Sequence, residues 1–274
     1  MNKEERLTQK VYSRDARVEW NRLGKDVYHR LEFETTMKFL KRYLPKKGLI
    51  LDAGAGPGRY TIELAKLGYD VVLLDFVKAN LDLAEEKIKK AGVEKKVRAV
   101  VHGSIVNLKE FKDNSFDAVI CLGGPLSHVC PEKNRKLALK ELRRVAKRNA
   151  PIFISVMMKY AVLMMAPNYW HQEIKITKHF EELLLKGEDY MWHKRYYCHF
   201  FISEELEALL KEAGINFIKK VGLEGISSPY RKAIRKIARD KKLWANWIKA
   251  HYYLCEKKEV ADTSMHTLFI GRKK

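Results

Sequence analysis

Three glycines at alternate positions mark the residues of this sequence that are best suited to chemistry. Gly54, Gly56 and Gly58 follow a short apolar run at residues 49–51 and precede residues 60–67, where apolar side chains recur at helical spacing. A strand, a glycine turn and a helix in this order are typical of a nucleotide-cofactor site at the carboxyl edge of a parallel sheet. Glycines let the backbone approach a ligand closely, and the helix N-terminus offers free N–H groups to an anion. These residues therefore predict a cofactor-binding turn.

Asp75 is the second residue with a predicted chemical role. It ends an apolar run at residues 70–75 and lies 17 residues after Gly58. In nucleotide-binding α/β folds, an acid at the tip of the second strand accepts hydrogen bonds from ribose hydroxyls. The alternative is an N-cap of the helix that begins near Ala79, and this role is compatible with the first. Phe76 would then lie flat against an adenine.

A sheet must hold these two features in place. Apolar runs alternate with helical segments along the chain, which predicts a Rossmann-like α/β fold, a parallel sheet with right-handed crossovers and helices on both faces. The last run alternates in polarity, so we expect it to lie at an edge of the sheet. The further predicted strands are residues 97–101, 115–122, 150–157, 215–221 and 263–271.

The chain divides into segments of different composition. We expect an N-terminal helical arm and two insertions to form a lid over the cofactor edge, because the strands before both insertions end at that edge. Most aromatic side chains of the first insertion are expected to form a small core, with one or two facing the pocket. The segments are the arm 1–47, the cofactor-binding core 48–157, the aromatic-rich insertion 158–202, the end of the core sheet at 203–222 and 263–274, and the basic helical insertion 223–262.

The formal charge of +20 makes an anionic partner such as RNA plausible, with solubility or heat stability as the alternative cause. The apolar stretches are too short to span a bilayer, and the charged start resembles no secretion signal. The four scattered cysteines favour reduced thiols, so we expect a cytoplasmic protein without a metal site. An RNA substrate would be held by basic residues on one face near 229–239 and on an earlier helix, namely Arg231, Arg235, Arg239, Arg143, Arg144, Lys147 and Arg148.

Four motifs in order resemble the class I S-adenosylmethionine-dependent methyltransferases. They are residues 51–59 (LDAGAGPGR), 72–75 (VLLD), 115–119 (SFDAV) and 142–145 (LRRV), and the resemblance covers roughly residues 46–157 and 203–222. It implies a C-terminal antiparallel strand and S-adenosyl-L-methionine as the cofactor, with S-adenosyl-L-homocysteine as the product. A dinucleotide dehydrogenase is the remote alternative, but its G-x-G-x-x-G spacing does not match these glycines.

The resemblance also implies where the cofactor lies. The glycine turn would line its methionine part, Asp75 would bind the ribose, and two later loops would contact the adenine and the sulfonium. Many members of the family carry Asp at the position of Ser104, so this residue is a departure that leaves a neutral acceptor. The implied cofactor-binding residues are Asp52, Gly54, Ala55, Gly56, Arg59, Asp75, Phe76, Ser104, Ile105, Leu122 and Gly123.

The acceptor and the catalytic groups are predicted less directly. His128 follows the fourth strand at the ligand edge and is the candidate for a base or orienting group, with simple substrate contact as the alternative. Tyr28, His199 and Arg231 are the candidate substrate residues, although packing explains Tyr28 as well. We favour a small-molecule acceptor, with a base-modifying RNA methyltransferase as the alternative and a non-catalytic cofactor-binding protein as a third class. The sequence carries no signal for an oligomeric state.

Overall fold

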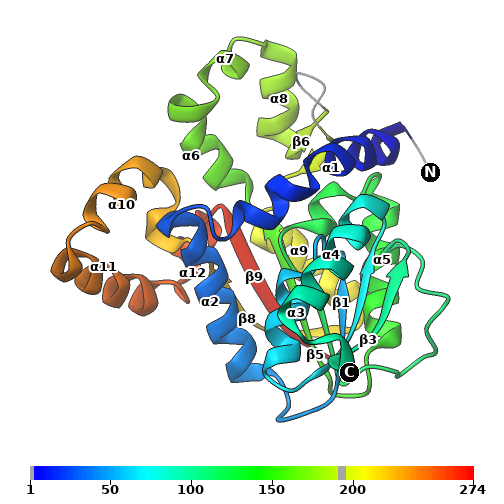
Figure 1. Ribbon diagram of the computed structural model, residues 1–274. Coiled ribbons are helices and arrows are strands. Elements are labelled where there is room, and N and C mark those ends of the chain that lie inside the picture. Colours follow the sequence, from blue (N-terminus) through cyan, green and yellow to red (C-terminus); the bar gives the residue numbers. More distant parts are fainter. Residues whose placement is uncertain (1–2, 191–195) are drawn as a thin grey trace.

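The computed structural model describes residues 3–190 and 196–274, and its centre is a mixed seven-stranded sheet (Figure 1). The strand order is β3-β2-β1-β4-β5-β9-β8, in which β9 alone runs antiparallel to its neighbours. The predicted Rossmann-like α/β fold with a C-terminal antiparallel strand is confirmed. The strands are β1 (Leu49–Ala53), β2 (Asp70–Asp75), β3 (Val97–His102), β4 (Ala118–Cys121), β5 (Pro151–Met157), β8 (Ile215–Gly222) and β9 (His266–Lys273), and a separate pair is formed by β6 (Glu188–Asp189) and β7 (Cys198–His199).

The last strand lies between β5 and β8 rather than at the outermost position predicted for it. Leu268, Phe269 and Ile270 are all buried, so both faces of β9 are covered. The polar residue Thr267 of this run is buried as well, and at Gly271 a Cβ atom would come within 2.5 Å of Ile215 Cγ2. A small residue at this position reflects close packing between β9 and β8 and not exposure at an edge.

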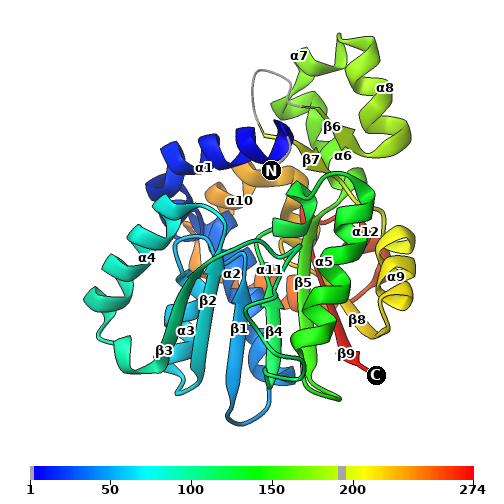
Figure 2. The same cartoon turned by 90° about the vertical axis from the view of Figure 1, so that its right-hand side faces the viewer.

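Two helical layers cover the sheet because alternate strand residues face opposite sides (Figure 2). In β1, Ile50 packs into the core with α2 and α3, whereas Leu51 packs into the core with α5 and α9. Leu73 of β2 joins α4 through a third cluster. The helices of these layers are α2 (Val27–Tyr43), α3 (Arg59–Lys66), α4 (Lys78–Ala91), α5 (Glu132–Val145) and α9 (Ser203–Glu212).

Several of the remaining helices lie near the carboxyl edge of the parallel strands, whereas η1 precedes β3 at the opposite edge. Figure 2 shows α1 lying across this edge, and α1 packs against α4. The chain turns at Leu23-Gly24, and the Asp26 side chain then caps α2 by accepting the His29 backbone N–H. No helix of the described residues is long and apolar enough to cross a membrane. The other elements are α1 (Lys3–Arg22), η1 (Glu94–Lys96), η2 (Pro125–His128), α6 (Lys159–Tyr169), α7 (His171–Ile174), α8 (Thr177–Lys186), η4 (Gly225–Tyr230), α10 (Arg231–Ile237), α11 (Lys241–Leu254) and α12 (Lys258–Asp262).

Candidate cofactor-binding site

A cavity of about 470 Å³ lies at the carboxyl edge of the sheet, where β1 and β2 end. The loops after β1, β2, β3 and β4 form its walls, and α1 contributes Thr8, Gln9, Tyr12, Glu19, Trp20 and Arg22. The structure brings most of the predicted cofactor residues into this one lining. They are Gly54, Ala55, Gly56, Arg59, Asp75, Phe76, Ser104, Ile105, Leu122 and Gly123, and His128 joins them.

The glycine turn has a backbone shape that other residues would not adopt without strain. Gly54 and Gly56 have φ angles of 78° and 55°, in the left-handed region. The Gly54 N–H donates to the Leu74 carbonyl at 2.8 Å, which joins the turn to β2. A Cβ atom on Gly54 would lie 2.6 Å from the Pro125 Cγ atom. A side chain at Gly54 would therefore displace Pro125, which follows β4 and also lines the cavity.

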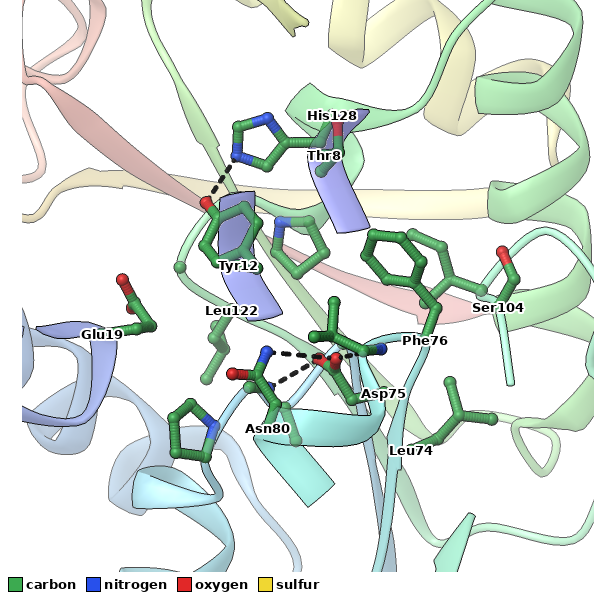
Figure 3. Close-up of a pocket in the computed structure, with 18 of the residues that line it drawn as sticks. Thr8, Tyr12, Glu19, Leu74, Asp75, Phe76, Asn80, Ser104, Leu122 and His128 are labelled. Atoms are coloured by element: carbon green, nitrogen blue, oxygen red, sulfur yellow. Dashed lines mark hydrogen bonds between the residues drawn. The ribbon is translucent and has the colours of Figure 1, made fainter. Parts of the chain in front are cut away.

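The Asp75 carboxylate lies in the cavity wall and is held by three donors (Figure 3). The Gly56 N–H donates to Oδ2 at 2.8 Å, while the Val77 N–H at 2.8 Å and the Asn80 amide at 3.2 Å donate to Oδ1. Burial raises the pKa of Asp75, and these hydrogen bonds partly offset that effect. Asp75 is not the N-cap of the following helix, because that position belongs to Val77; the carboxylate instead holds the Val77 N–H just before α4 while it faces the cavity.

Asp52 differs from the other predicted residues because it lies outside the cavity lining. It is only 1% exposed, and its Oδ2 accepts the Thr61 hydroxyl at 2.6 Å. Burial raises the pKa of Asp52 to about 7. This hydrogen bond joins the end of β1 to the first turn of α3, and so it stabilises the two segments that flank the glycine turn.

Replacing Asp52 with asparagine is expected to change how stability depends on pH. The folded state holds the Asp52 proton more tightly than the unfolded chain, so this group lowers stability as pH rises from about 4 to about 7. Between pH 4.5 and pH 8, D52N should gain about 2–4 kcal/mol relative to the wild type in urea unfolding. Asp82→Asn, which changes an exposed carboxyl group, is the control. A stability difference between D52N and wild type that does not move with pH would contradict this account.

Two loops form the end of the cavity where an adenine is expected. Phe76 and the buried Ile105 supply apolar contacts, and Ser104 is exposed to the cavity. The Ser104 hydroxyl accepts the Val106 N–H at 3.3 Å, so it remains free to donate to a ligand nitrogen. On the opposite wall, the Gly123 N–H donates to the Ser155 hydroxyl at 2.7 Å and fixes the loop after β4.

His128 is neutral and engaged at both ring nitrogens. Nδ1 lies 2.9 Å from the Tyr197 carbonyl, which requires the proton on Nδ1. Nε2 therefore accepts the Tyr12 hydroxyl at 3.0 Å, as Figure 3 shows. Burial lowers the pKa of His128 to about 4 and raises the pKa of Tyr12 well above its ordinary value. Tyr196 stacks on Tyr12 with their ring centres 5.2 Å apart. The Tyr12–His128 pair is therefore held by Tyr196 on the tyrosine and by the Tyr197 carbonyl on the histidine.

Arg22 enters the cavity wall from the end of α1 and is held by a chain of buried charges. Its guanidinium forms two hydrogen bonds with Glu32, at 2.5 and 3.1 Å, and one with Glu19 at 2.9 Å. His266 Nδ1 lies 3.7 Å from Glu32 and 2.7 Å from Glu224. Although burial opposes the effect, His266 lowers the pKa of Glu224 to about 2. Arg22 is thus a cation at a fixed position beside the loop after β4.

The contribution of α1 to the site was missed at the sequence level. The sequence predicts only a helical arm within residues 1–47, whereas the structure places α1, Lys3–Arg22, in the wall of the cavity. Thr8, Tyr12, Glu19 and Arg22 lie four, seven and three residues apart, a spacing that places them on one helical face. That spacing was the available signal, but polar residues at helical spacing commonly mark a solvent-exposed face.

The predicted substrate residues lie outside the cavity lining. Tyr28 is buried, and its hydroxyl donates to the Ser228 carbonyl at 3.3 Å. The Arg231 guanidinium lies 4.9 Å from the centre of the Tyr28 ring. His199 is buried between Glu188 at 3.1 Å and Glu205 at 2.7 Å. All three side chains serve contacts within the protein in this structure.

The predicted basic face also differs from the structure. α10 ends at Ile237, so Arg239 follows the helix. Arg231 packs on Tyr28, and Arg235 forms an ion pair with Asp26. On the other predicted helix, Arg144 binds Glu141 and Asp113. Lys147, which follows that helix, lies 2.6 Å from Asp117.

Comparison with known proteins places this site in a family. Residues 50–149 match the family model of a methyltransferase domain. A glycine/sarcosine N-methyltransferase of Aphanothece halophytica is 28% identical over 123 residues, which cover 45% of this chain and 44% of the relative. A demethylmenaquinone methyltransferase of Lactobacillus johnsonii is 29% identical over 182 residues, 65% of this chain and 72% of the relative. The chain spans about half the length of the glycine/sarcosine N-methyltransferases that it matches.

Solved structures share the fold at lower identity. A 1,6-didemethyltoxoflavin-N1-methyltransferase of Burkholderia thailandensis has a TM-score of 0.62 at 15% identity, over 98% of this chain and 88% of that one. A methyltransferase described as a possible histamine N-methyltransferase from Thermotoga maritima has a TM-score of 0.60 at 18% identity, over 97% of this chain and 99% of that one. The family match covers the glycine turn, Asp75 and the loop after β4, and the fold extends over the whole sheet. Residues 50–149 are therefore a methyltransferase domain, and the family match, the relatives and the shared fold together support a class I S-adenosylmethionine-dependent methyltransferase.

Proposed function

We propose that the protein transfers a methyl group from S-adenosyl-L-methionine to a small molecule bound beneath α1. The proposal rests on one observation: the glycine turn, Asp75, the loop after β4 and the polar face of α1 all line the same cavity. When bound, the cofactor supplies a methyl group on a positively charged sulfur, which is open to in-line displacement. The protein's part is to align the two partners and exclude water.

The residues of the cavity suit the cofactor's chemistry. The turn at Gly54 and Gly56 accepts the methionine part, and a Cβ at Gly54 would displace Pro125 from the same cavity wall. The Asp75 carboxylate is an acceptor for ribose hydroxyls, and Phe76 gives the adenine an apolar face. Arg22 is a fixed cation for the methionine carboxylate, although sequence reasoning did not include it.

A small acceptor is favoured because α1 covers the cavity. Arg59 holds α1 by donating to the Trp20 carbonyl at 2.6 Å, and Gln9 donates to the Phe76 carbonyl at 3.2 Å. A folded RNA would have to displace these contacts to bring a base to the methyl group. The relatives named for glycine, sarcosine and demethylmenaquinone also act on small molecules by their names. The four free cysteines agree with action in the reducing cytoplasm.

His128 and Tyr12 are proposed to orient the acceptor. Because Nδ1 donates to the Tyr197 carbonyl, Nε2 keeps the Tyr12 hydroxyl at a defined place in the wall. His128→Ala is expected to lower methyl-transfer turnover about 10- to 100-fold. The affinity for S-adenosylmethionine should change less than about threefold, since Asp75 and the glycine turn remain intact. Equal losses of turnover and cofactor affinity would contradict an orienting role at the acceptor.

The proposed function is tested with purified protein and cofactor labelled in the methyl group. The protein is incubated separately with the small-metabolite fraction and with the RNA fraction of its source. Label in a small metabolite, absent with Asp75→Ala, is the expected result. Label in RNA alone would replace the small-molecule acceptor with the RNA alternative, and label in neither fraction would overturn the proposal.

A further inference from the structure

A strongly basic surface lies on α10 and α11, away from the cavity. Residues 231–249 contain eight lysine and arginine residues and one acid, Asp240. Seven of the twenty excess positive charges of the chain are therefore concentrated in 19 residues. Figure 1 shows α10 and α11 projecting from the side of the molecule opposite α5. A charge concentrated in this way produces a local field that a dispersed charge does not.

One face of α11 carries a row of exposed polar side chains. Lys242, Asn246, Lys249 and Tyr253 are four, three and four residues apart, so they lie along one side of the helix. All four are exposed, and Tyr253 is 75% exposed. We call this row the α11 stripe. It combines two positive charges with one accessible aromatic ring.

The apolar face of α11 is already used within the protein. His251 is fully buried and bonds to the Thr35 hydroxyl at 2.9 Å. Trp247 is half-buried and donates to the Ser227 hydroxyl at 2.9 Å. An amphipathic helix that binds a lipid surface must insert an apolar face. The free face of α11 is instead polar and basic, which suits a partner that presents charge rather than hydrocarbon.

Apart from Arg235, which pairs with Asp26, the exposed basic residues of this surface have no carboxylate partner in the described part of the chain. Some surface lysines elsewhere in the chain are paired, as in Lys66–Glu63 at 2.8 Å and Lys186–Glu182 at 3.0 Å, whereas this surface concentrates unpaired ones. Among residues 3–190 and 196–274, no carboxylate oxygen lies within 4.0 Å of the ammonium or guanidinium nitrogens of Lys232, Lys236, Arg239, Lys242 and Lys249. Charges that serve heat stability form ion-pair networks. Unpaired cations in one cluster point instead to an external anion.

We propose that α10 and α11 bind single-stranded RNA. The lysines neutralise successive phosphates, and the ring of Tyr253 stacks on an unpaired base. Such a base is available in the loops and ends of RNA but not on the outside of a duplex. Arg231 and Arg235 are already engaged with Tyr28 and Asp26, so the phosphate contacts fall to the lysines and Arg239.

The test is fluorescence anisotropy of a labelled 20-nucleotide single-stranded RNA, titrated with the full-length protein at several salt concentrations. The double variant K242E/K249E is expected to weaken binding at least tenfold and to flatten the salt dependence, because about two phosphate contacts are lost. Tyr253→Ala should weaken binding about 5- to 100-fold by removing the stacking ring. Lys89 and Lys90, exposed on α4, provide the matched control K89E/K90E, which should bind RNA within about threefold of the wild type.

Four outcomes would overturn the proposal. They are no RNA binding at 50 mM salt, equal losses for K89E/K90E and K242E/K249E, tighter binding of single-stranded DNA of the same sequence, and binding to anionic phospholipid vesicles but not to RNA. Thermal unfolding and S-adenosylmethionine binding of each variant show that the fold and the cavity are intact. Because the α11 stripe lies outside the cavity lining, loss of RNA binding with intact cofactor binding separates this proposal from the methyl-transfer proposal.

Discussion

Replacing Asp75 with alanine is expected to lower the affinity for S-adenosylmethionine about 100-fold or more. The change removes the carboxylate that would accept the ribose hydroxyls, and hydrogen bonds to a charged group contribute about 1.5–3 kcal/mol each. Two such bonds correspond to roughly two orders of magnitude or more in the dissociation constant. The glycine turn is also affected, because the Gly56 N–H would lose the acceptor that it reaches at 2.8 Å. Titration calorimetry of both proteins measures the effect directly.

A second variant separates binding from folding at this position. Asp75→Asn keeps the side-chain volume and one carbonyl oxygen for the Val77 N–H or the Gly56 N–H, and urea unfolding of the variant shows whether it is folded. It cannot accept hydrogen bonds from both ribose hydroxyls as strongly as a carboxylate. We expect its affinity to lie between those of the wild type and D75A. Cofactor affinity within threefold of wild type for a folded D75A protein would contradict the assigned role.

Glu32→Gln is expected to destabilise the folded protein by about 3 kcal/mol. The side chain of Glu32 is 2% exposed and neutralises Arg22, so its loss leaves a partly buried guanidinium without its bidentate partner. Glutamine keeps the volume, which excludes a cavity as the cause. Because Arg22 lines the cofactor cavity, S-adenosylmethionine should also bind less tightly. Urea unfolding monitored by circular dichroism measures the loss.

The matched control is Glu63→Gln on α3. Glu63 forms an ion pair with Lys66 at 2.8 Å, but the two side chains are 34% and 49% exposed. An exposed pair of this kind contributes at most about 1 kcal/mol. The two variants lose the same charge, so the difference between them isolates burial. A loss below about 1 kcal/mol for E32Q would mean that the Arg22–Glu32 contact is not important for stability.

The parts of the site that follow from local sequence were predictable. The glycine turn and Asp75 lie at strand ends, and the parallel sheet brings those ends together. Their types and spacing therefore specify a position in space. Phe76, Ser104 and Leu122 follow for the same reason, since each comes after a strand that ends at this edge.

The cover of the cavity could not be predicted in the same way. Tyr12 contacts His128, which lies 116 residues later in the sequence, and Arg22 of α1 binds Glu32 of α2. Such contacts depend on how α1 packs against the rest of the protein. The sequence of α1 has few large apolar residues that would indicate which of its faces is packed. Asp52 is a different case, because its position in the sequence predicted a ligand contact that the structure does not show. Its side chain, on β1 next to the glycine turn, accepts the Thr61 hydroxyl instead.

The central claim is that the cavity beneath α1 binds S-adenosylmethionine, and calorimetry of the wild-type protein tests it most directly. The account predicts one S-adenosylmethionine or S-adenosylhomocysteine bound per chain and no heat of binding with the nicotinamide dinucleotide NAD. The absence of S-adenosylmethionine binding, or tighter binding of NAD, would contradict it.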